Sequence, residues 1–164
     1  MRSNRCSPRR LFGRGRLTDD SGAALVEFAL IAPLLLLLLF GMIDFGKAFN
    51  YWIDETHLAN EGARWAVVNK NPGTGTLQQY IQQQADTPEL RSGGSSSVPN
   101  AMQVCITFPN GSAKVGDPVH VTTRVTYRWL AFIAGEIGAT ETTVTGSSTM
   151  RLEAVPTTYS AGCA

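Results

Sequence analysis

The chain of 164 residues has few of the side chains that carry enzyme chemistry. It holds two histidines, His57 and His120, which stand far apart in sequence and lack metal-ligand spacing. It contains no phosphate-binding glycine loop and no Cys-x-x-Cys pair. Cys105 and His120 would supply a nucleophile and a base, but no third partner or oxyanion site accompanies them. The sequence therefore predicts a protein that is not an enzyme and that uses no metal, cofactor or small-molecule substrate.

Charge is also scarce, at 16% of residues, and the net charge is only +1. That balance hides an uneven distribution, because six arginines against two aspartates give residues 1–22 a net charge of +4. The arginines are Arg2, Arg5, Arg9, Arg10, Arg14 and Arg16. The remainder of the chain is mildly acidic and has no basic patch, which argues against a nucleic-acid partner.

Residues 23–43 form a run that is uncharged apart from Glu27. At about 1.5 Å per residue it reaches roughly 31 Å as a helix, which matches a bilayer hydrocarbon core of about 30 Å. The arginines precede this run, and Lys47 is the only Lys or Arg among residues 44–63. The positive-inside rule then predicts a single-pass protein of the cytoplasmic membrane, with residues 1–22 cytoplasmic and the C-terminal domain periplasmic or extracellular.

Three interpretations of this N-terminus compete. A secretory signal peptide would need a cleavage site, and Gly46-Lys47-Ala48 is a poor one. A twin-arginine signal, suggested by Arg9-Arg10-Leu11-Phe12, is interrupted by two acids before the apolar run. An uncleaved anchor would tether a small extracytoplasmic binding domain, with Glu27 lying solvated near the interface. An acid costs about 2.5 to 3.5 kcal/mol at the centre of a membrane helix and less near its end, so position alone leaves this open.

The third interpretation, a prepilin-type signal, rests on a resemblance. Three segments carry it: Ser21 to Pro33 (SGAALVEFALIAP) with Gly41 to Gly46 (GMIDFG), Ala59 to Ala66 (ANEGARWA), and Ser148 to Glu153 (STMRLE). In this order they resemble the TadE-like pseudopilin family of the tight-adherence (Flp) pilus system. The match is strongest over residues 21–70 and is mostly one of pattern beyond them.

The resemblance implies a minor pilin that assists assembly of a tight-adherence type IV pilus. A prepilin peptidase would cut between Gly22 and Ala23, leaving a charged amine on Ala23. The carboxylate of Glu27, followed by Phe28, would then meet the amine of a neighbouring subunit and offset both desolvation costs. The implied partners are the prepilin peptidase, the major pilin and other pseudopilins, the pilus membrane platform proteins and membrane lipid.

Beyond the membrane run, residues 44–70 are predicted to continue as an amphipathic helix. Its apolar stripe has steps of four and three and narrows from aromatic to small residues: Phe45, Phe49, Trp52, Thr56, Ala59, Ala63 and Ala66. This face would pack either on the chain's own β-domain or on other subunits. Asn71-Pro72-Gly73 ends the helix.

Residues 71–100 are predicted to hold a short helix and a flexible loop. Thr76 and Gln79 fit a capping box, Thr87-Pro88 ends the helix, and residues 92–97 have the composition of a linker. Residues 101–164 then alternate with a period of two, which predicts an antiparallel β-domain with strands near 102–108, 119–129 and 142–153. The expected fold class is therefore α+β.

Cysteine placement agrees with this topology. Cys105 and Cys163 both lie on the exported side, where oxidising conditions permit a disulfide, whereas Cys6 lies in the leader. A bridge across this separation would stabilise the fold by about 4 kcal/mol on the chain-entropy model, and two free thiols are the alternative. The apolar stretch 130–135 is expected to cover the sheet's core, or else to touch the membrane or a partner.

Overall fold

The computed structural model describes residues 20–129 and 140–164. Most of the predicted leader and the apolar stretch 130–135 therefore lie outside the described residues. The chain divides into two compact units, one ending at Leu39 and one beginning at Phe40.

Helix α1, Asp20–Val67, supplies the described part of the first unit. Its side chains from Gly22 to Leu39 are apolar apart from Glu27, and none of them is buried. A helix that is apolar on every side needs an apolar solvent around it. Among the described residues, α1 is the one helix that is long and apolar enough to cross a membrane, as expected for a single-pass protein.

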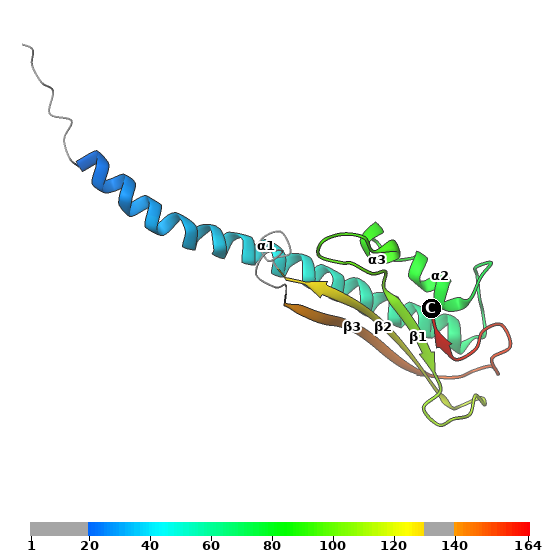
Figure 1. Ribbon diagram of the computed structural model, residues 1–164. Coiled ribbons are helices and arrows are strands. Elements are labelled where there is room, and N and C mark those ends of the chain that lie inside the picture. The colour runs from blue at the N-terminus through cyan, green and yellow to red at the C-terminus, as the bar shows by residue number, and fades with distance from the viewer. Residues whose placement is uncertain (1–19, 130–139) are drawn as a thin grey trace, which may run out of the picture. The chain divides into compact units, whose positions relative to one another are not determined.

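The second unit is built on a four-stranded antiparallel sheet in the order β3-β2-β1-β4 (Figure 1). The strands are β1 Gln103–Thr107, β2 Pro118–Arg128, β3 Glu141–Arg151 and β4 Gly162–Cys163. Strands β2 and β3 pair without interruption from Pro118↔Arg151 to Arg128↔Glu141. The predicted α+β class is confirmed, with one strand more than the sequence indicated, because two residues of β4 leave no periodic signal.

Two short helices complete this unit: α2, Leu77–Gln83, and α3, Pro88–Ser92. The predicted capping box is present, since the Thr76 hydroxyl accepts from the Gln79 amide while the Gln79 side chain accepts from the Thr76 amide. Thr87-Pro88 opens α3 as well as following α2, because Pro suits the first turn of a helix. The segment predicted to be a flexible loop contains a turn closed by a bridge between Gly93 and Asn100, and its flexibility stays a prediction.

The buried face of α1 differs from the predicted stripe at its aromatic end. Ala59, Ala63 and Ala66 are fully buried, so the narrow part of the face packs on the chain's own domain. Phe45, Phe49 and Trp52, by contrast, are 63%, 49% and 47% exposed. The buried positions of those turns are Asp44, Ala48, Tyr51, Asp54 and Glu55. A pattern based on hydrophobicity misses this face because most of its positions are acidic.

The C-terminal end of α1 is capped by the tail of the chain. The Val67 carbonyl accepts from the amides of Glu153 and Ala154, and the Ala66 carbonyl accepts from the Tyr159 hydroxyl at 2.8 Å. Asn69, with a positive φ of 51°, turns the chain away, and its side-chain oxygen accepts from the amides of residues 157 and 158. Carbonyls that a helix end leaves unpaired are thus satisfied by distant residues.

Candidate assembly site

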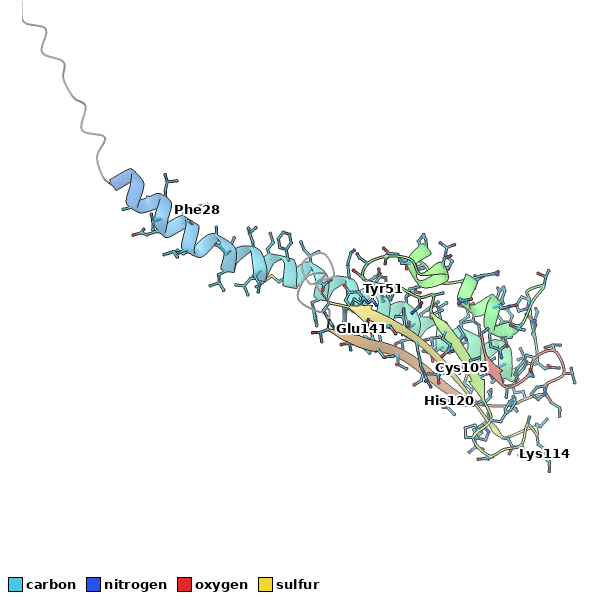
Figure 2. The ribbon with its side chains drawn as sticks, in the orientation of Figure 1. Phe28, Tyr51, Cys105, Lys114, His120 and Glu141 are labelled. Carbon is cyan, nitrogen blue, oxygen red and sulfur yellow. A yellow bond between two sulfur atoms is a disulfide. The ribbon has the colours of Figure 1, made fainter. Side chains whose placement is uncertain are left out.

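The residues predicted for processing and assembly lie together at the start of α1. Gly22, Ala23, Glu27 and Phe28 are all exposed, and Figure 2 shows Phe28 projecting from the helix. Because α1 begins at Asp20, the bond between Gly22 and Ala23 lies within the first helical turn. The first four amides of a helix have no partner within it, so this turn is the least costly one to unwind.

Glu27 follows Ala23 by four residues, and residues at this spacing share one face of a helix. The described chain therefore places the carboxylate one turn from the amine that cleavage would create. All other side chains between Gly22 and Ile43 are uncharged. The pairing between neighbouring subunits stays a prediction, since it requires a second chain.

Two tyrosine–carboxyl pairs tie the second unit's part of α1 to the rest of the fold. The Tyr127 hydroxyl donates to Oδ1 of the buried Asp44 at 2.5 Å, and the Tyr51 hydroxyl donates to Oε2 of Glu89. Burial raises the pKa of Tyr127 above its usual range, and the hydrogen bond to Asp44 adds to the rise. Burial and Glu89 raise the pKa of Tyr51 in the same way. Both phenols therefore remain donors across the physiological pH range.

One turn further along, α1 approaches the sheet very closely. The Thr123 hydroxyl on β2 donates to the Glu55 carbonyl at 3.0 Å. A side chain on Gly146 of β3 would collide with the backbone of Glu55 and Thr56. Glycine at position 146 is therefore what allows the helix backbone to lie against the strand.

The Glu55 side chain is enclosed at this contact and is 0% exposed. Neither of its carboxyl oxygens forms a hydrogen bond of normal geometry with a described residue. Burial raises the pKa of Glu55 to about 8, the charge of Asp54 contributes, and the backbone of Gly146 opposes the rise only in part. At neutral pH the group is thus mainly protonated, which avoids the high cost of a buried, unpaired carboxylate.

The predicted cysteine pair is present as a disulfide between Cys105 of β1 and Cys163 of β4. These residues face each other in the antiparallel register, with their Cα atoms 4.0 Å apart. The Gln78 side chain holds the same segment by donating to the Ser160 carbonyl at 2.9 Å. Because the sulfur of Cys105 is bonded, it is not a free nucleophile for His120, whose Nδ1 lies 2.7 Å from the Thr149 hydroxyl.

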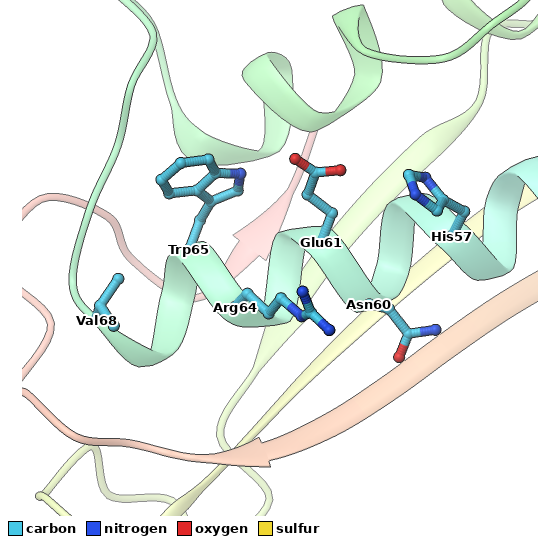
Figure 3. Close-up of a pocket in the computed structure, with 6 residues that line it drawn as sticks. All are labelled: His57, Asn60, Glu61, Arg64, Trp65 and Val68. Carbon is cyan, nitrogen blue, oxygen red and sulfur yellow. The ribbon is translucent and has the colours of Figure 1, made fainter.

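A hollow with a volume of about 500 Å³ lies along the outer face of α1 (Figure 3). It is lined by His57, Asn60, Glu61, Arg64, Trp65 and Val68. Within the described ranges, no group of three or more His, Cys, Asp or Glu side chains could hold a metal ion. The hollow offers mixed charge on one helix face and no constellation of groups for a defined reaction.

A groove with a volume of about 410 Å³ lies between the aromatic end of this part of α1 and the start of β3. Phe45, Phe49 and Trp52 line one side of it, and Thr143, Val144 and Thr145 line the other. The Phe45 ring also stacks on Trp129, with centroids 6.5 Å apart. The aromatic end of the predicted stripe, for which packing on the chain's own β-domain and packing on other subunits were both left open, therefore forms the wall of an open groove.

Sequence reasoning missed both Asp44 and Glu55 as buried residues. The available signal was their spacing with Ala48 and Tyr51, which marks a second face of the helix, but polar residues count against burial in such a pattern. The sequence did not predict the contact at Gly146. A glycine within a strand can indicate that another backbone comes close, but it does not show which segment does so.

Comparison with known proteins gives one match. Residues 22–64 match a family model described as TadE-like protein, and this segment contains Gly22, Ala23, Glu27 and Phe28. Neither a curated protein nor a solved structure matches the chain significantly. The resemblance inferred from the sequence is therefore confirmed over this segment.

Proposed function

We propose that this chain, which carries a TadE-like segment at residues 22–64, is a minor pilin or pseudopilin of a tight-adherence type IV pilus. The TadE-like family implies a part in the Tad pilus. The finer role, processing by a prepilin peptidase followed by assistance to assembly, is our proposal. The observation that carries it is a single acid, Glu27, one helical turn after Ala23, in a stretch of α1 that is otherwise uncharged from Gly22 to Ile43.

Cleavage after Gly22 would create a positively charged amine on Ala23, at the start of an apolar helical segment. A positive charge at the N-terminus of a helix is opposed by the helix dipole, which carries roughly half a positive charge at that end. A nearby carboxylate attracts the amine and offsets this repulsion. The same pairing offsets part of the free energy lost when the carboxylate leaves water. Glu27 of the same chain and Glu27 of a neighbouring subunit are both candidates. The second pairing would fix the register between parallel helices in an assembly.

The proposed topology follows from charge. Residues 1–22 carry the arginines and would stay in the cytoplasm, while residues 44–164 would lie in the periplasm or outside the cell. The disulfide between Cys105 and Cys163 supports an oxidising compartment for this part. The proposed partners are the prepilin peptidase, the major pilin, other pseudopilins and the membrane platform proteins.

One observation favours an alternative, in which the chain keeps its leader and anchors a small extracytoplasmic binding domain. Helix α1 begins at Asp20 and runs through the bond between Gly22 and Ala23 without a break. An uncleaved anchor requires nothing of that bond, whereas a peptidase that binds an extended chain must first unwind it.

Intact mass of the membrane-extracted protein distinguishes the two. We expect a chain that starts at Ala23. Gly22→Leu should leave the leader attached, while the matched Gly22→Ala variant keeps a small residue and should be cut. A wild-type chain that retains residues 1–22 in cells with an active prepilin peptidase would exclude the pseudopilin role.

Assembly is tested separately. Glu27→Gln should leave cleavage intact and sharply reduce both surface pili and co-purification with the major pilin and platform proteins. Val26→Ala, a neutral change at the adjacent position, is the control and should behave as wild type. Normal piliation with Glu27→Gln would show that the carboxylate has no role in assembly.

A further inference from the structure

Strand β3 forms one border of the sheet, and no described strand pairs with its outer side (Figure 1). The hydrogen bonds next to the strand define which of its residues face outward. Trp129 donates to the Thr140 carbonyl, and Leu152 donates to the Asp117 carbonyl. In an antiparallel pair such bonds recur at every second residue, so the even-numbered residues of β3 pair with β2.

The odd-numbered residues of β3 therefore turn their backbone N–H and C=O groups outward. Thr143, Thr145, Ser147 and Thr149 are these residues, and all four side chains are exposed. The even-numbered side chains, among them the buried Val144, point to the face that packs on α1. Among residues 20–129 and 140–164, no strand pairs with these outward groups, so the outer edge is a row of backbone donors and acceptors. One face of this edge packs toward α1 and the other is exposed.

This edge lacks the features that normally keep edge strands from pairing. It has no charged residue and no proline between Glu141 and Arg151, and the register with β2 is continuous, without a bulge. Monomeric proteins protect long edges with lysine, proline, bulges or short strands, because an open ladder recruits other chains. A strand of this length left unprotected indicates a surface that is covered when the protein works.

The apolar groove beside β3 indicates which side chains a strand that pairs with this edge would carry. Phe45, Phe49 and Trp52 form its wall on α1, immediately next to Thr143, Val144 and Thr145. A strand added to β3 would direct every second side chain over this wall and the alternate ones to solvent. The groove therefore suits an apolar residue at every second position, and the uncharged edge suits an uncharged segment.

We propose that β3 is a docking edge for a β-strand of a different protein chain, uncharged and apolar at every second residue. A second copy of β3 fits less well. Antiparallel pairing that joins Arg151 to Glu141 at both ends would set Ser148 opposite Val144 and Gly146 opposite Gly146, which leaves the groove unfilled. The proposal adds a partner surface to the proposed pseudopilin role and does not depend on cleavage after Gly22.

Amide hydrogen exchange of the full chain tests it. The rates are compared, at single-residue resolution, between the detergent-purified protein and native membranes that contain the complete pilus system. We expect Thr143, Thr145, Ser147 and Thr149 to exchange at least tenfold more slowly in membranes. Equal rates in the two samples would overturn the proposal. The mass of the N-terminus in the same samples reports cleavage independently.

Two variants show whether slow exchange at β3 comes from backbone hydrogen bonds to an added strand or from another kind of contact. Thr145→Pro removes one outward N–H and leaves the bonds to β2 in place, because proline is tolerated on an edge strand. Thr145→Val keeps the N–H and nearly the same shape. We expect the proline variant alone to lose the slow exchange at residues 143 and 147, while its even-numbered amides stay protected. If both variants behave as wild type, the cover is not a strand.

Photo-crosslinking from position 143, followed by peptide mapping, identifies the occupant. We expect a segment of another protein that alternates apolar and polar residues. A crosslink to β3 of a second copy would replace the proposed partner, and a crosslink to lipid or to a helix would exclude strand addition.

Discussion

The Tyr127 hydroxyl and the Asp44 carboxyl lie 2.5 Å apart although 83 residues separate them in sequence. Asp44 follows directly on the apolar run, and Tyr127 stands near the end of β2. The Tyr127 ring also packs against Tyr51, with ring centroids 5.8 Å apart. Strand β2 is thus hydrogen-bonded to α1 at Asp44, the first acidic residue after the predicted membrane segment.

Removing this hydrogen bond should destabilise the second unit. Tyr127→Phe keeps the buried ring and loses the donor to Asp44. A hydrogen bond to a charged group contributes about 1.5 to 3 kcal/mol, so the free energy of unfolding should fall by that amount. Denaturant unfolding of the full chain in detergent, followed by tryptophan fluorescence, measures it. Tyr80→Phe is the control, and a similar loss in both variants would contradict a specific role for the pair.

Glu55 should make the unit less stable as pH rises. Its pKa in the folded state, about 8, lies above the ordinary glutamate value of 4.5, so the folded chain holds the proton more tightly. The stabilisation is complete below about pH 4.5 and is lost as pH rises toward 8. Its upper limit is about 5 kcal/mol over that interval.

The variant Glu55→Gln isolates this contribution, because glutamine has nearly the same shape and does not titrate. Its free energy of unfolding should be close to wild type at pH 4.5 and should exceed wild type increasingly toward pH 9. Subtracting the two profiles cancels the titration of all other groups. Parallel profiles from pH 4.5 to 9 would show that the carboxyl is not buried in the folded protein.

Gly146 should tolerate no side chain. Gly146→Ala places a methyl group against the Glu55 backbone, which must shift by moving α1 or β3. Overpacking of this kind costs about 1 to 3 kcal/mol. The matched control is Thr145→Ala on the exposed side of the same strand, where a change should cost well under 1 kcal/mol. Thermal unfolding by circular dichroism compares them, and equal midpoints would contradict the close approach.

Loss of the disulfide should weaken the same unit from its other edge. Replacing Cys105 and Cys163 together by serine should reduce the free energy of unfolding by about 4 kcal/mol, within the usual range of 2 to 5. Cys6→Ser should have no effect. Reduction of the wild-type protein should reproduce the double variant, whereas insensitivity to reductant would mean that the bond does not form.

The sequence predicted those parts of the fold that depend on local pattern. The apolar run, the capping box at Thr76 and Gln79, and the alternating strands follow from spacing along the chain. The buried face of α1 could not be predicted in the same way. Asp44 and Tyr51 are buried because Tyr127 and Glu89 supply their partners, and pairing across such distances leaves no local trace.

In the candidate site, too, some features could be predicted from local sequence and others depend on distant parts of the fold. Glu27 stands out in sequence because an acid in an apolar run is costly wherever the chain folds. The free edge of β3 becomes visible only when strand order is known, since the same residues at the centre of a sheet would offer nothing to a partner.

The tail that caps α1 also sets the order in which the domain can be completed. The Val67 carbonyl receives its partners from residues 153 and 154, and β1 receives its second neighbour only at Gly162 and Cys163. Until those residues have been synthesised and have reached the same compartment, neither the helix end nor the outer side of β1 has its partner. A chain that stops before Glu153 therefore lacks both contacts, whereas a chain that stops between Tyr159 and Gly162 keeps the cap of α1 and loses β4 with its disulfide.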